Sequence, residues 1–363
     1  MRKILILSSS SILLLLLSAY IATLLTTLQP AAMEPAAVVC DKAPLMNKST
    51  FRVLDYNVQY MAGKTKNFWY DGGTDIMPSA EDITRTTSEV ARVIKEANPD
   101  FVLLQEINEN DIRTYHRDEL KELRELLGTR YPCYSEAFYW QADFVPHPHI
   151  MGSVGMKLVT LSKFKINKAV RHQLPIPSRL PIHRDFQFKR ALLETEIATK
   201  NATKNGGSSE GKLALLNTHL DAWEQGTGIM QQQVAKIDDV IKELEKQHTT
   251  WLIGGDFNLL PPNHQSEMLQ KLGRGDYDKV SAIKVLFDQY AVIPSLEDLN
   301  SDNEKAWFTY LPNGKEITEP DRTIDYIFYS SSLEKQRATV KHNNTWKTSD
   351  HMPIIAEFSW NKK

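Results

Sequence analysis

The chain divides into an apolar N-terminal segment and a long alternation of strand-like and helix-like patterns. Short apolar runs predict buried strands at 51–58, 100–107, 151–162, 191–199, 212–220, 249–257, 323–330 and 352–360. Apolar residues at helical spacing predict helices at 79–98, 121–130 and 226–247. Ser79 is a suitable N-cap for the first helix, and Asn98-Pro99 ends it. The polar, glycine-containing stretch 201–211 reads as a hairpin loop between two strands.

The order of these elements indicates the fold class. Strands outnumber helices and several follow one another directly, which favours sheets packed on sheets over a doubly wound parallel sheet. No repeat at a solenoid period occurs. We therefore predict an α+β protein with two sheets and external helices, formed by one domain over residues 50–361.

The N-terminal segment is the clearest topological signal. Residues 4–25 contain no charged side chain, and a helix of that length can cross an apolar layer about 30 Å thick. Arg2 and Lys3 before it favour a cytoplasmic N-terminus. We predict a signal anchor or a cleaved signal peptide over residues 1–28, followed by a Pro/Ala-rich linker over 29–49. The rest of the chain would then be membrane-anchored outside the cytoplasm, or secreted if the segment is cleaved.

Composition adds two constraints. The formal net charge of −2 gives no overall cationic field that would draw the chain to nucleic acid or to an anionic membrane. Two cysteines, Cys40 and Cys133, are too few for a disulfide framework or a thiolate metal site. They could pair in an oxidising compartment, or Cys133 could simply be a buried thiol.

Polar residues capable of chemistry recur at the ends of the predicted strands. Each one alone could be a capping or turn residue, but together they form a set of carboxylates, amides and histidines with few lysines. Such oxygen-rich sets suit a hard cation, and no H-E-x-x-H zinc motif occurs. The set comprises Asn57, Gln105, Glu106, Asn217, His219, Asp256, Asn258, Asp325, Asp350 and His351.

Six segments in order carry a resemblance to a known family: YNVQYMAG, LLQEIN, LLNTHLDAW, IGGDFN, TIDYIFY and TSDHMPI. They resemble the endonuclease/exonuclease/phosphatase superfamily, the metal-dependent phosphoesterases related to deoxyribonuclease I. The resemblance covers roughly residues 50–360. It implies a four-layer α/β/β/α sandwich of two mostly antiparallel sheets, with Mg²⁺ as the cofactor and Mn²⁺ as an alternative.

The resemblance assigns the metal and nucleophile roles. Glu106 matches the glutamate that holds the catalytic metal, Asn57 the amide that supports it, and Asp350 a further acid near it. Asp256 matches the aspartate that orients or deprotonates the attacking water, with Asn258 beside it on the phosphate side. These roles agree with the chemistry, because phosphate ester hydrolysis needs an in-line nucleophile and neutralisation of developing charge.

The remaining roles concern the phosphate. His351 matches the catalytic histidine and Asp325 its carboxylate partner. His219 matches the histidine that contacts the phosphate or assists the leaving group. Asn217 is a candidate phosphate contact, and Arg190 could reach a phosphate from its strand or form a salt bridge.

Substrate and partners follow less directly. The family includes nucleases, phosphoinositide phosphatases and sphingomyelinases, and the fold does not choose among them. A polynucleotide or a phospholipid headgroup is the expected substrate, and the N-terminal segment is the expected membrane contact. We expect no obligate protein partner. The alternative function is a membrane-tethered binding module that keeps the fold without catalysis, against which the full set of site residues argues.

Overall fold

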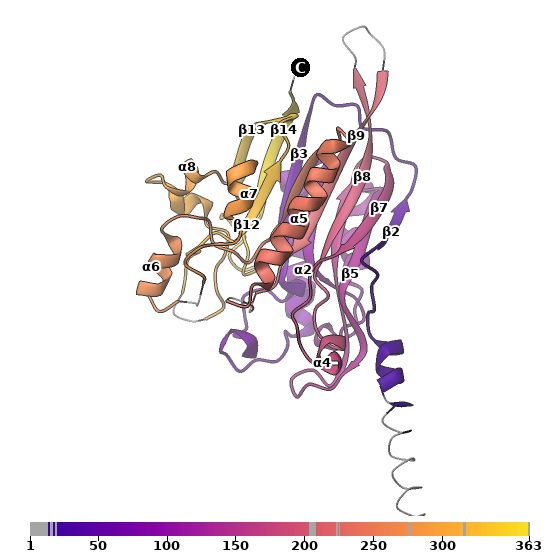
Figure 1. The fold of residues 1–363 in the computed structure, drawn as a ribbon, viewed down its shortest axis with the longest axis vertical. Coiled ribbons are helices and arrows are strands. Elements are labelled where there is room, and N and C mark those ends of the chain that lie inside the picture. Colours follow the sequence, from indigo (N-terminus) through magenta and orange to yellow (C-terminus); the bar gives the residue numbers. More distant parts are fainter. Residues whose placement is uncertain are drawn as a thin grey trace, which may run out of the picture.

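Two seven-stranded β-sheets stack face to face at the centre of the molecule (Figure 1). This computed structural model describes residues 14, 17–18, 20–202, 208–222, 224, 226–274, 277–314 and 317–361. One sheet, the β9–β10 sheet, has the strand order β1 (Met33–Pro35), β7 (Ile166–Gln173), β8 (Ala191–Ala202), β9 (Ser208–His219), β10 (Thr250–Asp256), β12 (Asp325–Tyr329) and β11 (Ala291–Ile293). The other, the β3–β4 sheet, has the order β13 (Leu333–Val340), β14 (Ile354–Trp360), β3 (Thr50–Asn57), β4 (Phe101–Asn108), β6 (Gly152–Ser162), β5 (Cys133–Val145) and β2 (Ala37–Cys40).

Helices cover the outer faces of both sheets. Helix α5 (Ile229–Lys246) packs Ile237 and Ile241 on Trp251 of the β9–β10 sheet. Helices α2 (Ala80–Ala97) and α3 (Glu119–Leu127) cover the β3–β4 sheet. The shorter helices are α4 (Pro181–Asp185), α6 (Gln265–Lys271), α7 (Lys284–Gln289) and α8 (Leu296–Leu299). The order helix, sheet, sheet, helix agrees with the predicted α+β sandwich.

An apolar core joins the two sheets. Phe51 and Phe101 from the β3–β4 sheet share one buried cluster with Leu215 and Ile327 from the β9–β10 sheet. Each of these side chains is at most 1% exposed, so each contributes roughly 1.5–3 kcal/mol of transfer free energy. This core fixes how the two sheets face each other, and therefore which strand ends meet.

Both sheets have the same pattern of strand directions. Each contains one parallel pair, β3 with β4 and β9 with β10, while every other neighbouring pair in the two sheets is antiparallel. In a parallel pair both strands end at the same edge of the sheet. The polar residues that follow strands β3, β4, β9 and β10 therefore collect at one edge of the sandwich.

The predicted strands and helices are present with shifted ends. Helix α2 begins after Ser79, whose hydroxyl accepts a hydrogen bond from the Asp82 amide at 3.0 Å, and it ends at Asn98 in a left-handed conformation. Strands β8 and β9 pair antiparallel up to Ala202 and Ser208, which confirms the hairpin. Its tip, residues 203–207, lies outside the described part of the chain.

The segment predicted as a linker, residues 29–49, contains two strands. Strand β1 pairs with β7, and β2 pairs with β5, so the segment closes one edge of each sheet. Cys40 and Cys133 face each other in the β2–β5 register and form a disulfide. The pairing alternative therefore holds: Cys133 is fully buried, but as one half of a disulfide and not as a thiol.

The predicted N-terminal anchor falls largely outside the described residues, which omit 1–13, 15, 16 and 19. Residues 20–26 are helical. Among the helices that the structure describes, none has the length and apolar character needed to span a bilayer.

Candidate active site

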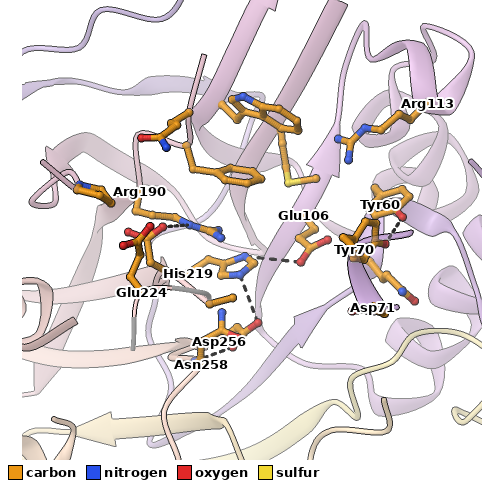
Figure 2. Close-up of a pocket in the computed structure, with 18 of the residues that line it drawn as sticks. Tyr60, Tyr70, Asp71, Glu106, Arg113, Arg190, His219, Glu224, Asp256 and Asn258 are labelled. Carbon is orange, nitrogen blue, oxygen red and sulfur yellow. Dashed lines mark hydrogen bonds and ion pairs between the residues drawn. The ribbon is translucent and has the colours of Figure 1, made fainter. Parts of the chain in front are cut away.

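Four adjacent strand ends supply the centre of the site. Asn57 ends β3, Glu106 lies near the end of β4, and His219 and Asp256 are register partners at the ends of β9 and β10. The Asn57 side-chain amide donates to Glu106 Oε1 and to Asp256 Oδ2, each at 3.0 Å. It therefore links the carboxylates of the two sheets. Figure 2 shows Glu106, His219 and Asp256 converging on one point.

His219 stands between the two carboxylates. Its Nδ1 lies 3.8 Å from Glu106 Oε1 and 3.3 Å from the Tyr139 hydroxyl, and its Nε2 lies 3.4 Å from Asp256 Oδ2. Burial lowers the pKa of His219 well below its usual value, with Arg190 and His351 adding to the effect. The imidazole is therefore neutral at pH 7, which suits a hydrogen-bond contact to phosphate rather than a cationic one.

His351 also contacts Asp256. Its Nε2 lies 3.4 Å from Asp256 Oδ2, and its Nδ1 lies 2.9 Å from Asp325 Oδ2. Burial opposes the charged imidazole, but the carboxylates of Asp325 and Asp256 raise the pKa of His351 well above its usual value. The ring is thus held in one orientation as a buried cation.

Asp256 is the junction of these contacts. Burial raises its pKa to about 7, while His351 lowers it and Asp325 raises it. The backbone amide of Asn258 donates to Asp256 Oδ1 at 2.9 Å, and this fixes the carboxylate plane. A carboxylate with a pKa near neutrality can accept a proton at physiological pH, as a general base must.

Two residues of the site have strained backbone. Glu106 has φ of 59° within an irregularity of the β4–β6 register, and Asn258 has φ of 50° directly after β10. Glutamate rarely adopts positive φ, and such residues cluster at functional sites. The Asn258 side chain donates to the Leu220 carbonyl at 3.1 Å, so it bridges the loops after β9 and β10.

The two predicted phosphate contacts differ. Arg190 is 2% exposed and lines the cleft, with its guanidinium 4.3 Å from the Phe188 ring and its Nε 3.3 Å from Asp221 Oδ1. Asn217 instead joins the sheets: it accepts from Gln105 and donates to the carbonyls of Leu104 and Val159. Both side-chain N–H groups of Asn217 are engaged in this way, so the structure places Asn217 between the sheets and not among the residues that line the cleft.

Asp350 lies beside His351. Its Oδ1 is 3.9 Å from His351 Nε2, and its Oδ2 accepts from the Asn313 amide at 3.4 Å. Burial raises its pKa to about 7, and the His351 and Lys64 charges lower it. The same amide of Asn313 also donates to Asp71 at 2.8 Å, which adds a further acid to this side of the site.

The site opens into a cleft of about 1080 Å³ with a largely aromatic wall. Figure 2 shows Tyr60, Tyr70 and Arg113 across the cleft from Arg190. Sequence reasoning did not assign the roles of Asp71, Asn313 and Tyr139; the only signal was the aromatic composition of the segments FWYDGG and FYWQADF. The wall is lined by Tyr60, Trp69, Tyr70, Trp140, Phe186, Phe188, Tyr277 and Tyr310.

The side chains fit a divalent cation. The donor atoms of Glu106, His219 and Asp256 lie within 4.8 Å of one another, and two of the three are carboxylates. Asp350 is not part of this group among the described residues. Asn57 directs its NH₂ to the carboxylates, while its Oδ1 accepts from the Gln59 amide at 3.0 Å. In this arrangement Asn57 positions the carboxylates of Glu106 and Asp256 by donating to them.

Comparisons with known proteins agree with this picture. A structure of an endonuclease/exonuclease/phosphatase from Beutenbergia cavernae is 17% identical, with a TM-score of 0.57 over 86% of this chain and 72% of that chain. The human Nocturnin catalytic domain with bound sulfate anion is also 17% identical, with a TM-score of 0.52 over 90% and 99%. A Bacteroides vulgatus structure is 16% identical, with a TM-score of 0.51 over 86% and 100%. No curated protein matches the sequence.

The architecture and the site define a hydrolase class that acts on phosphoester bonds. Residues 72–351 match the Endonuclease/Exonuclease/phosphatase family. The match covers most of the chain, so the chain belongs to this family, as its motifs predicted.

Proposed function

We propose that this chain is a divalent-metal-dependent phosphodiesterase in which Asp256 activates a water for in-line attack on phosphorus. The observation that carries the proposal is the position of Asp256 Oδ2, which has Asn57 at 3.0 Å and both His219 and His351 at 3.4 Å. An oxygen in that position can take a proton from a water, and the two imidazoles around it can face a phosphate.

The residues divide the work among them. Asp256 accepts the proton, because burial raises its pKa to about 7. His351, kept cationic by Asp325, offsets negative charge that develops on the phosphate, and neutral His219 donates a hydrogen bond to a phosphate oxygen. Glu106 would hold Mg²⁺ or Mn²⁺, which supplies Lewis-acid polarisation of the phosphoryl oxygen when bound. Arg190, which also lines the cleft, adds a second cationic side chain.

The cleft supports a diester as substrate rather than a small monoester. Its volume of about 1080 Å³ exceeds the space that a phosphate and a single small group need, and its aromatic wall suits a nucleobase or an apolar moiety. The proposed substrates are a polynucleotide or a phospholipid headgroup. Human Nocturnin's catalytic domain holds a sulfate, which is tetrahedral like phosphate, and this supports an anion site in the shared fold.

For localisation we propose an extracytoplasmic catalytic domain, attached to the membrane or secreted after cleavage. The Cys40–Cys133 disulfide supports this, because structural disulfides persist mainly in oxidising compartments.

The test uses the full chain, because β1 and β2 complete the sheet edges. Plasmid DNA, RNA, sphingomyelin vesicles and phosphoinositide vesicles are incubated side by side with Mg²⁺, Mn²⁺ or EDTA. We expect metal-dependent cleavage of one class, lowered by about 10²–10⁴-fold in Asp256→Ala and in His351→Ala. Exposed His248→Ala serves as the matched control.

Glu106→Gln separates the metal role from the base role. The substitution removes the negative charge of the proposed ligand, so it should raise the Mg²⁺ concentration for half-maximal activity by about tenfold or more. A tenfold change in affinity corresponds to about 1.4 kcal/mol. An unchanged Mg²⁺ titration would refute Glu106 as a ligand, and normal turnover in Asp256→Ala would refute the mechanism.

A further inference from the structure

Three large apolar side chains are exposed beside residues that line the cleft. Phe144 is 47% exposed, Met151 is 56% exposed and Leu180 is 67% exposed. We call these three residues the apolar rim. Each is next in sequence to a residue that lines the cleft, respectively Val145, Ile150 and Arg179. The catalytic mechanism uses none of the three, so their exposure needs a separate explanation.

The N-terminal segment contacts strand β5 close to the apolar rim. Thr27 forms a β-bridge with Ala142, and the Leu28 amide donates to the Gln141 carbonyl at 2.8 Å. The Gln29 side chain donates to Asp185 of α4 at 3.3 Å. Figure 1 shows the indigo N-terminal helix beside the end of the molecule that carries α4. The chain that precedes residue 27 therefore leaves the domain next to the apolar rim.

That preceding chain is itself apolar and exposed. Leu17, Ile21 and Leu25 follow at helical spacing and are 47–81% exposed, within the uncharged stretch 4–25. Exposed apolar side chains thus occur both on the entering helix and on the rim, and residues 27–28 join the domain beside Gln141 and Ala142, close in sequence to Phe144. Adjacent exposed apolar patches of this kind mark a contact with a partner or a membrane.

The charges near the rim indicate which kind of surface the rim would contact. Arg184 is exposed in α4, but Asp143 is exposed directly beside Phe144, and Arg179 is paired with Glu224. These described residues therefore give no one-sided basic field of the kind that draws a protein to nucleic acid phosphates or to anionic lipid. What distinguishes the rim is its exposed apolar side chains, and these fit insertion into the acyl region of a lipid surface.

We propose that the apolar rim inserts into a lipid bilayer and presents the mouth of the cleft to phosphoesters in lipid headgroups. The docking surface stands on the exposed side chains and on the path of the N-terminal segment. The choice of substrate rests in addition on the proposed phosphodiesterase function. Insertion should persist at high salt, because it does not depend on charge attraction.

The experiment places a fluorescent probe on the rim. The only two cysteines of the chain form a disulfide, so an introduced cysteine is the single free thiol. Phe144→Cys, Met151→Cys and Leu180→Cys are labelled in the full chain and mixed with phosphatidylcholine vesicles that carry a quencher on the acyl chains. Lys246→Cys is the control, because α5 ends at the sheet edge opposite the site.

We expect strong quenching at all three rim positions and none at residue 246, in low and in high salt. In a Leu180→Cys chain, the pair Phe144→Ser and Met151→Ser should reduce quenching several-fold. Val285→Ser is the matched control, since Val285 is as exposed as Phe144, at 47%. Vesicle-bound chain whose rim probes stay unquenched would overturn the proposal, as would equal quenching with and without the serine substitutions.

A soluble substrate separates this proposal from the proposed function. The rim variants should hydrolyse bis(p-nitrophenyl) phosphate at the rate of the unaltered chain, because no rim residue lines the cleft. If the unaltered chain does not hydrolyse any phosphodiester, the proposed function fails while the quenching result still decides the docking. If the serine variants lose soluble activity, the rim belongs to the catalytic cleft, and the docking proposal is wrong.

Discussion

Arg190 and Asn217 were assigned the same role from the sequence, yet their surroundings separate them. Arg190 comes just before β8, and its guanidinium is buried against the aromatic wall with Nη1 unpartnered by any described group. Asn217 lies within β9, where each side-chain atom is used by a neighbouring strand. A cationic group with a free donor in a cleft can bind substrate, whereas a saturated amide between sheets can only stabilise the fold.

Substitution distinguishes the two roles. Arg190→Met keeps an unbranched, largely apolar stem and removes the guanidinium, so kcat/KM should fall by about 10–100-fold, equivalent to the roughly 1.5–3 kcal/mol of a charged hydrogen bond. Some thermal stability should also be lost, because the substitution leaves the buried Asp221 carboxylate without its cation, so the diagnostic quantity is kcat/KM of the folded protein. Steady-state kinetics and calorimetry on the same preparation measure both quantities, and an unaltered kcat/KM would remove Arg190 from the substrate site.

Asn217→Ala should show the reverse pattern. It leaves Gln105 and two carbonyls in the core without their partner, which costs about 1–3 kcal/mol for each unsatisfied group. The free energy of unfolding in urea should drop accordingly. The fraction that remains folded should keep most of its kcat, and a pure loss of substrate affinity at unchanged stability would contradict this assignment.

The sequence identified the residues that converge but not all of their neighbours. Glu106, His219, Asp256, Asp325 and His351 end or begin apolar strands, and this regular position made them visible. Asp71 and Asn313 come from irregular loops that are 242 residues apart. Their contact depends on how loops fold over the sheet edge, and no local pattern encodes that.

The position of Asp256 at the end of strand β10 depends on the two glycines that precede it, Gly254 and Gly255. A Cβ on Gly254 would lie 2.8 Å from Leu103 Cδ1, and a Cβ on Gly255 would lie 2.1 Å from the Thr218 carbonyl oxygen. The missing side chains allow β10 to approach β9 and the opposite sheet closely. The run of apolar residues followed by Gly-Gly-Asp thus sets the separation between Asp256 and His219.

Gly255→Ala should therefore disturb the site through its strand. The backbone of β9 cannot yield as a flexible side chain would, so we expect a loss of roughly 1–3 kcal/mol in stability together with reduced kcat. Gly128→Ala is the control, because its Cβ would meet nothing within 4 Å. Equal effects in the two variants would show that only the glycine backbone conformation matters.

Strands β5 and β13 were not predicted from the sequence, because neither has the regular alternation of apolar and polar residues that marks a strand. Strand β5 has register shifts between Phe138 and Trp140 and between Ala142 and Val145, which break the alternation that marks a strand. Strand β13, LEKQRATV, lies at an edge and is mostly polar. Tertiary pairing, rather than local pattern, creates these elements.

Protonation of two buried carboxyls affects both the stability of the whole molecule and its affinity for a cation. Burial raises the pKa of Asp256 and of Asp350 to about 7, compared with about 4 in an unfolded chain. Without a cation, these carboxyls favour the folded state below pH 4, and that contribution is lost as the pH rises through about 7. A cation needs the ionised form, so it competes with protons.

The affinity for Mg²⁺ should therefore be weaker at pH 6 than at pH 8 by about tenfold for each carboxyl that must ionise, with protons released on binding. Isothermal titration calorimetry in two buffers of different ionisation enthalpy measures both effects. Asp350→Asn removes one of the two acids and should flatten the pH dependence. Equal affinity at the two pH values would show that neither carboxyl is protonated near the cation.

The path of residues 27–40 has a mechanical consequence. This segment bridges to β5, pairs with β7 through β1 and with β5 through β2, and is then covalently joined to β5 at Cys40. Any tension on the N-terminus is therefore resisted first by strand pairing and then stopped by a covalent link. Strand β3, which supplies Asn57, begins after that link, so a load on the N-terminal segment would bypass the strand ends that hold Asn57, Glu106 and Asp256.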